Sequence, residues 1–138
     1  MPLLKPLNPP LQNWRGTTVW LVGASTGIGQ ATASALHALG AQVVVSARKA
    51  QALDAFVQAH PGARALALDV TDAQAVQAAA MQLQARGPLD CVVYCAGHYQ
   101  AMRAFAMDVP NMQRHMEVNY TGALQVLNAV LPAMLARG

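Results

Sequence analysis

The residues from Gly23 to Gly29 have the types and the spacing that suit the binding of a pyrophosphate. Glycines at positions 23, 27 and 29 follow the apolar run at 19–22 and lead into a predicted helix. A glycine-rich turn lets the backbone approach a phosphate closely, and the first helical turn offers it free N–H groups and a positive dipole end. Because strand, turn, helix and second strand have suitable lengths, we predict a dinucleotide-phosphate site rather than a simple tight turn.

Arg48 is the residue type that could neutralise a second phosphate. It follows Ala47 at the end of a valine-rich segment, and no acidic residue stands at this strand end. An acid there would bind the ribose 2′-hydroxyl of NAD, whereas an arginine pairs with the 2′-phosphate of NADP. We therefore predict NADP(H) in preference to NAD(H), with Ser46 and Lys49 as candidates to assist. The plainer alternative is a solvated surface arginine.

The elements that must position these residues alternate along the chain. Apolar runs and breakers predict strands at 17–22, 42–47, 64–68 and 89–94 and helices at 27–39, 50–59, 71–86 and 109–136. Thr71 is the expected N-cap of the third helix, and Pro132 should bend or break the last one. This alternation predicts an α/β fold with a doubly wound parallel sheet (Rossmann-like) in the strand order 3-2-1-4. We expect an extended proline-containing arm at 1–13 and one domain at 14–138.

The glycine turn resembles that of the short-chain dehydrogenase/reductase family. The family signature Thr-Gly-x-x-x-Gly-x-Gly is matched from Gly23 to Gly29, with Val22 in place of the threonine. The resemblance covers 14–138 but only the N-terminal half of the family. It implies an NAD(P)-binding domain whose cofactor-binding residues are Gly23, Ser25, Thr26, Gly27, Ile28, Gly29, Arg48, Asp69, Val70, Ala96 and Gly97.

Within this resemblance, Asp69 caps the adenine amino group and Val70 lies beside the ring. The alternative for Asp69 is a turn acid or a helix cap, although Asp72 could instead supply the cap. Ala96 and Gly97 match the end of the family's Asn-Asn-Ala-Gly motif near the nicotinamide ribose, but Tyr94 stands where its first asparagine ties the central sheet together. We expect those hydrogen bonds to be weakened or re-routed.

Asn119 matches the helix asparagine of the family and is the catalytic residue that the resemblance implies. In the family its main-chain carbonyl holds a water that leads protons to the catalytic lysine. The family's Ser, Tyr and Lys have no counterpart, because the only lysines are Lys5 and Lys49. The segment from Tyr99 to Arg103 imitates Tyr-x-x-x-Lys, but it lies in a predicted loop and is not expected to be catalytic.

The resemblance therefore implies an NADP(H)-dependent oxidoreductase acting on a small-molecule carbonyl or alcohol, here as its cofactor-binding half. We expect the chain to be truncated before the fifth strand, inactive alone and prone to self-association through an open sheet edge. The complete protein would be a homo-oligomer. One alternative is a non-catalytic nucleotide-binding module. Another is a methyltransferase that uses S-adenosylmethionine, which Ala47 and Arg48 disfavour because it prefers an acid at this strand end.

The composition argues against nucleic-acid-binding, membrane, disulfide-bonded and metal-binding proteins. Charged residues make up 11% of the 138 residues, the net charge is +3, and the basic residues are scattered, so no nucleic-acid or membrane patch is expected. The uncharged stretch at 16–47 is broken by glycines and polar residues, and no signal peptide is evident. Cys91 and Cys95 lie too far apart on a strand for a disulfide, so we expect free thiols, a cytoplasmic protein and no metal site. The four histidines are interpreted as surface or loop residues.

Overall fold

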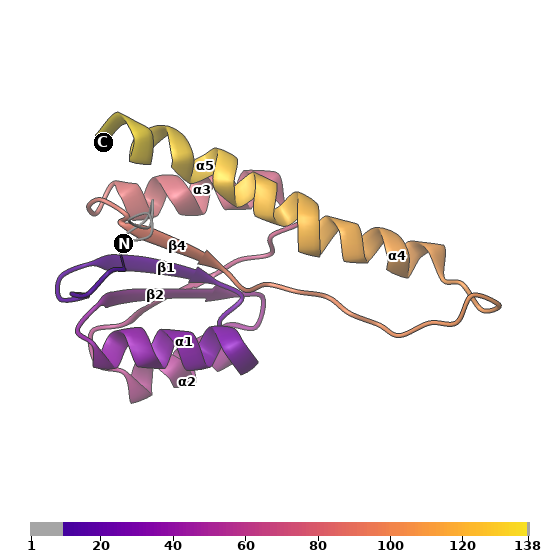
Figure 1. The fold of residues 1–138 in the computed structure, drawn as a ribbon, viewed down its shortest axis with the longest axis horizontal. Coiled ribbons are helices and arrows are strands. Elements are labelled where there is room, and N and C mark those ends of the chain that lie inside the picture. Colours follow the sequence, from indigo (N-terminus) through magenta and orange to yellow (C-terminus); the bar gives the residue numbers. More distant parts are fainter. Residues whose placement is uncertain (1–9, 138) are drawn as a thin grey trace, which may run out of the picture.

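The apolar runs form a four-stranded parallel sheet in the computed structural model, which describes residues 10–137 (Figure 1). The strands are β1 (Thr18–Val22), β2 (Gln42–Ala47), β3 (Arg64–Ala67) and β4 (Cys91–Tyr94). They lie in the order β3-β2-β1-β4, which confirms the predicted doubly wound topology. All three strand pairs are parallel, so the carboxyl ends of the four strands share one edge of the sheet.

The two central strands are buried on both faces. Along β1, Trp20 and Val22 join the core under one helix layer, whereas Val19 and Leu21 join the core under the other. Alternate side chains of a strand point to opposite faces, so a strand covered on both sides must be apolar throughout. Ser46 is the buried polar residue of β2: it is fully buried, and its Oγ accepts a hydrogen bond of 2.9 Å from Nε1 of Trp20.

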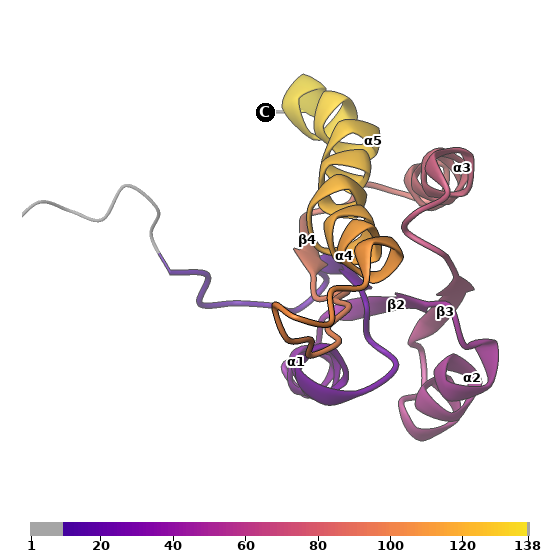
Figure 2. The same cartoon turned by 90° about the vertical axis from the view of Figure 1, so that its right-hand side faces the viewer.

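Helices cover the two faces in pairs (Figures 1 and 2). The first pair, α1 (Gly27–Ala38) and α2 (Ala50–Ala59), lies on one face. The second pair, α3 (Ala73–Gln84) and α5 (Gly122–Arg137), lies on the other face. Helix α5 is directly preceded by α4 (Val109–Met116) and a π-helical segment, η1 (Glu117–Thr121). The loop after β4 and α4 extend beyond the carboxyl edge of the sheet.

The N-cap predicted for the third helix was wrong. Helix α3 is capped by Asp72 rather than Thr71, because the Asp72 carboxylate accepts a hydrogen bond of 3.0 Å from the backbone N–H of Ala75. Thr71 instead donates to Asp69. The helix predicted at 109–136 is confirmed: α4, η1 and α5 follow one another without a gap, with π-helical hydrogen bonding over η1. The break considered at Pro132 is absent, since Pro132 lies inside α5. The ends of three strands differ from prediction by one or two residues, a normal uncertainty for element ends.

Most of the predicted N-terminal arm, residues 1–9, lies outside the described residues. Residues 10–13 have no regular secondary structure. Between residues 10 and 137, no helix has the length and apolar character needed to cross a bilayer.

We expect Ser46→Ala to lower the free energy of unfolding by about 1–3 kcal/mol, because the buried indole N–H of Trp20 would lose its acceptor. Urea denaturation followed by circular dichroism measures this loss. In a Trp20→Phe background the donor is already gone, so the same substitution should cost less. An equal cost in both backgrounds would contradict a role for this hydrogen bond.

Candidate dinucleotide-binding site

The carboxyl ends of all four strands open onto one cavity of about 420 Å³. In doubly wound sheets, ligands bind beyond the carboxyl ends of the strands, where the chain order reverses. Here that reversal lies between β1 and β4, because β2 and β3 follow on one side of β1 and β4 pairs on the other. The cavity wall comprises Val22, Gly23, Ser25, Thr26, Ile28, Gly29, Ala47, Arg48, Lys49, Leu68, Asp69, Val70, Cys95, Ala96, Gly97, His98 and Val118.

Gly23 is the point of closest approach between the turn after β1 and the segment after β4. A Cβ atom on Gly23 would lie 2.2 Å from the backbone nitrogen of Ala96, and the φ angle of Gly23 is +91°. Gly29 is confined as well, since a Cβ there would lie 2.2 Å from the carbonyl oxygen of Gly23. Both positions therefore exclude a side chain, and the turn can fold back against its neighbours only with glycine here.

Backbone hydrogen bonds hold the turn to both neighbouring strand ends. The N–H groups of Gly23 and Ala24 donate to the carbonyl oxygen of Ser46 at 2.7 and 3.1 Å, and the N–H of Cys95 donates to the carbonyl of Val22 at 2.7 Å. The N-terminus of α1 is thereby set at the cavity, with Thr26 as its N-cap. Thr26 makes no side-chain capping bond, so its hydroxyl is not used in closing the helix.

The structure brings nearly all the sequence-predicted cofactor residues to this cavity. Of that group only Gly27 is absent from the wall; its φ of +60° shapes the turn instead. Ser46, the suggested assistant of Arg48, cannot face a ligand because it is fully buried against Trp20. Six further wall residues were not predicted as cofactor residues: Val22, Ala47, Leu68, Cys95, His98 and Val118. For the first four, their position at or next to a predicted strand end is the signal that could have found them.

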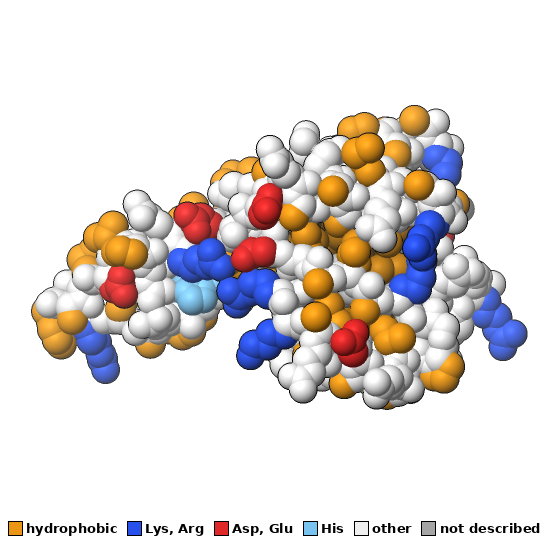
Figure 3. Space-filling model, turned by 180° about the vertical axis from the view of Figure 1, so that it is seen from behind, with side chains coloured by type: hydrophobic (Ala, Val, Ile, Leu, Met, Phe, Trp, Pro, Cys, Tyr) orange, Lys and Arg blue, Asp and Glu red, His pale blue; other side chains and the backbone are white. Residues whose placement is uncertain are grey.

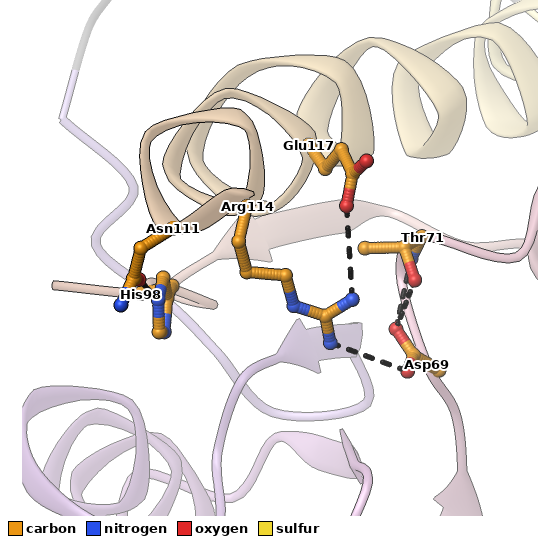
Figure 4. Close-up of polar contacts among 6 residues, drawn as sticks. All are labelled: Asp69, Thr71, His98, Asn111, Arg114 and Glu117. Carbon is orange, nitrogen blue, oxygen red and sulfur yellow. Dashed lines mark hydrogen bonds and ion pairs between the residues drawn. The ribbon is translucent and has the colours of Figure 1, made fainter. Parts of the chain in front are cut away.

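Asp69 is the acid of the cavity, and it is held by three contacts (Figure 4). The backbone N–H and the hydroxyl of Thr71 donate to its Oδ1 at 3.0 and 2.7 Å, and Nη2 of Arg114 lies 3.7 Å from its Oδ2. Partial burial raises the pKa of Asp69, but the Thr71 hydrogen bonds and the charges of Arg114 and Arg48 outweigh it, so the pKa lies below its ordinary value. Asp69 is therefore ionised at neutral pH.

Asn119 lies outside the cavity wall, in η1, and secures the loop after β4. Its Oδ1 accepts a hydrogen bond of 2.7 Å from the backbone N–H of His98, and its Nδ2 donates to the carbonyl of His98 at 2.8 Å. One side chain thus satisfies both backbone groups of a residue on the cavity wall. This side-chain contact is additional to the carbonyl role that sequence reasoning assigned to Asn119.

Tyr94 forms a second link between the end of β4 and η1. Its hydroxyl donates to the carbonyl of Val118 at 2.5 Å. In η1 the N–H of Gly122 bonds to the carbonyl of Glu117 rather than to that of Val118, its partner in an α-helix. The pKa of Tyr94 is raised to about 12 by burial and by the charge of Asp69, so the hydroxyl remains a donor. Tyr94 thus ties the end of β4 to the helical segment that follows the loop.

His98 joins a polar cluster at the mouth of the cavity. Its Nε2 lies 2.7 Å from Oδ1 of Asn111, and its ring centroid lies 5.0 Å from that of His115. His115 accepts a hydrogen bond of 2.8 Å from the backbone N–H of Gln100. His98 is thus a wall residue as well as a loop residue. Nowhere in 10–137 do three His, Cys, Asp or Glu side chains gather closely enough to hold a metal ion.

The chain matches the family model "short chain dehydrogenase" over residues 17–138. It is 34% identical to L-xylulose reductase from Homo sapiens over 89% of this chain and 49% of that protein. It is 36% identical to galactitol 2-dehydrogenase (L-tagatose-forming) from Cereibacter sphaeroides, with the same coverages. The structure of a short-chain dehydrogenase from Streptomyces avermitilis superposes with a TM-score of 0.83 at 34% identity, over 88% of this chain and 46% of that one.

The family match covers well over half of the chain, so this protein belongs to the short-chain dehydrogenase family. The chain spans about half the length of the two enzymes named above. The family implies an NAD(P) cofactor, and the cavity fits one: glycine backbone that a Cβ would block lies beside a helix N-terminus, the exposed Arg48 and an ionised aspartate.

Gly23→Ala should destabilise the fold by more than the strain of its positive φ, because the new Cβ would overlap the backbone of Ala96. Gly62→Ala is the matched control: Gly62 has a φ of +89° but no atom within 4 Å, so it should cost only about 1–2 kcal/mol. Urea titrations compare the two variants. Equal losses would show that the approach of Gly23 to Ala96 does not constrain the fold.

Proposed function

We propose that this chain binds NADP(H) and supplies the cofactor-binding half of an oxidoreductase that interconverts a small-molecule carbonyl and an alcohol. The observation that carries the proposal is the convergence of the Gly23–Gly29 turn, Arg48, Asp69 and Ala96–Gly97 on one cavity. These groups match successive parts of a dinucleotide: the pyrophosphate, the 2′-phosphate, the adenine and the nicotinamide ribose. When bound, the cofactor supplies hydride transfer at its nicotinamide ring.

The preference for NADP(H) rests on Arg48. The side chain is exposed on the cavity wall directly after β2, next to Lys49, and Ala47 precedes it. A guanidinium pairs with a phosphate through two parallel hydrogen bonds, whereas an acid at this place would repel it. The cavity wall at the end of β2 carries only positive charge, which favours the phosphorylated cofactor.

The residues of this chain bind and orient rather than transfer protons. Backbone N–H groups at the N-terminus of α1 would hold the pyrophosphate, and Asp69 would accept a hydrogen bond from the adenine amino group. Asn119 fixes the loop that carries His98. None of the tyrosines is followed four residues later by a lysine. We therefore propose that the 138 residues bind the cofactor without turning over substrate by themselves.

The names of the relatives suggest which carbonyl compounds to test in the whole protein. L-xylulose reductase and galactitol 2-dehydrogenase (L-tagatose-forming) are named for ketoses and polyols. A non-catalytic nucleotide-binding module is the second candidate function, favoured by the lack of a Tyr-x-x-x-Lys sequence. The free thiols of Cys91 and Cys95 suit a reducing compartment, and we place the protein in the cytoplasm.

We also propose that the protein self-associates through α4, η1 and α5. Large apolar side chains recur at intervals of three or four along these helices and are 38–70% exposed: Met112, Met116, Tyr120, Leu124, Leu127, Leu131 and Leu135. Hydrophobic side chains also surface on the protruding arm seen at the left of Figure 3. Contiguous apolar stripes of this kind mark protein contacts, and a second copy of the chain offers the same stripe.

Arg48→Gln should weaken NADPH binding by about 10- to 100-fold, as expected for the loss of a charge-assisted contact, and leave NADH binding unchanged. Isothermal titration calorimetry with both cofactors measures this difference. Arg64→Gln removes the same charge outside the cavity wall and is the control. NADH binding as tight as that of NADPH in the unmodified chain would contradict the preference.

The double substitution Leu127→Glu with Leu131→Glu should convert an oligomer to a monomer, because two charges would be buried in the contact. Sedimentation velocity measures the change. Leu39→Glu changes a side chain of similar exposure, 56%, that lies next to α1 rather than on the stripe, and should leave the assembly intact. Dissociation by the control variant alone would contradict the proposed surface.

A further inference from the structure

Arg114 contacts a wall residue of the cofactor cavity, Asp69, without lining the cavity itself. It projects from α4, and its guanidinium lies between two carboxylates, 3.7 Å from Asp69 and 3.7 Å from Glu117 (Figure 4). The side chain is 32% exposed, so it is held partly away from water. Figure 3 shows basic, acidic and histidine side chains gathered where the protruding arm joins the body of the molecule. Arg114 can therefore act on a ligand through Asp69 rather than by direct contact.

The two oxygens of Asp69 are not equivalent. Oδ1 accepts from the backbone N–H and from the hydroxyl of Thr71, which occupies both of its lone pairs. Oδ2 has the Arg114 guanidinium at 3.7 Å, which is an ion pair and longer than a hydrogen bond. Oδ2 is consequently the carboxylate oxygen that retains free capacity to accept from a ligand.

We propose that Arg114 is a positioning residue for the adenine end of the cavity: by its ion pair it keeps Oδ2 of Asp69 in place to accept the adenine amino group. The inference rests on the proposed function. Adenine is common to both cofactors, so Arg114 supports NADPH and NADH equally. In this it differs from Arg48, which lines the wall and whose proposed partner is the 2′-phosphate that only NADP(H) carries.

Several charged or titratable groups face Asp69. Arg114 approaches from α4 and Arg48 from the end of β2, and both lower the pKa of Asp69; Tyr94 faces it from β4, and Glu117 shares Arg114. A carboxylate with a lowered pKa stays a hydrogen-bond acceptor until the pH falls below that value. Removal of Arg114 raises the pKa of Asp69, so cofactor binding should fail at a higher pH on acidification.

The test is Arg114→Gln, titrated with NADPH and with NADH by calorimetry at several pH values. Both cofactors should bind about 2- to 5-fold more weakly at neutral pH, the range expected for a partly exposed ion pair. The acid limb of both binding profiles should move to higher pH. Arg103→Gln is the matched control, because it removes one positive charge from the loop before α4 and should change neither affinity nor profile.

Each result decides the inference. A loss confined to NADPH would make Arg114 a phosphate ligand, and unchanged affinity with an unchanged acid limb would remove it from the site; either overturns the proposal. Circular dichroism shows whether Arg114→Gln is misfolded. In that case Glu117→Gln replaces it as the test variant. It removes the second carboxylate that pairs with Arg114, so Arg114 pairs with Asp69 only and both cofactors should bind at least as tightly as before. If the unmodified chain binds neither cofactor, the proposed function fails and the inference falls with it.

Discussion

The contact of Gly23 with the backbone of Ala96 is the constraint on which the rest of the site depends. It joins the turn after β1 to the segment after β4, the two chain segments that diverge where the strand order reverses. With no Cβ between them, the N-terminus of α1 and the Ala96–Gly97 backbone reach the same cavity. A side chain here would separate the two halves of the wall, because the nearest atoms are backbone and cannot rotate away.

Around this contact, side chains rather than regular structure hold the segment after β4. Two side-chain contacts tie it to η1, one before and one after Ala96–Gly97 in the sequence. The Tyr94 hydroxyl donates to the Val118 carbonyl, and the Asn119 amide bonds to both backbone groups of His98. The π-helical turn allows the contact of Tyr94. In η1 the Gly122 N–H bonds to the Glu117 carbonyl rather than to the Val118 carbonyl, which accepts from the Tyr94 hydroxyl instead. Gly122 also admits the tyrosine, since a Cβ there would lie 2.5 Å from the Tyr94 hydroxyl oxygen. Tyr94 and Gly122 are thus complementary.

Patterns that are local in the sequence predicted the strand order and the glycine turn, since right-handed crossovers and a Gly-rich strand-to-helix turn leave few alternatives. The features that were missed depend on contacts between distant residues. Thr71 and Asp72 are both suitable N-cap residues for α3. The Thr71 hydroxyl donates to the Asp69 carboxylate, so the carboxylate of Asp72 caps the helix instead. Likewise, the Tyr94 hydroxyl contacts η1 from the end of β4, and the ion pair of Arg114 with Asp69 joins a helix to a strand end far away in the sequence.

The central claim is that this cavity, and not another surface of the chain, takes the cofactor. Backbone amide shifts of the isotopically labelled chain, followed by NMR during a titration with NADPH, test it most directly. The account predicts that the largest changes fall on 23–29, 47–49, 69–70 and 96–98, all at the carboxyl edge of the sheet. Changes confined to the smaller cavity at 84–89 and 133–137, or no changes at all, would contradict it.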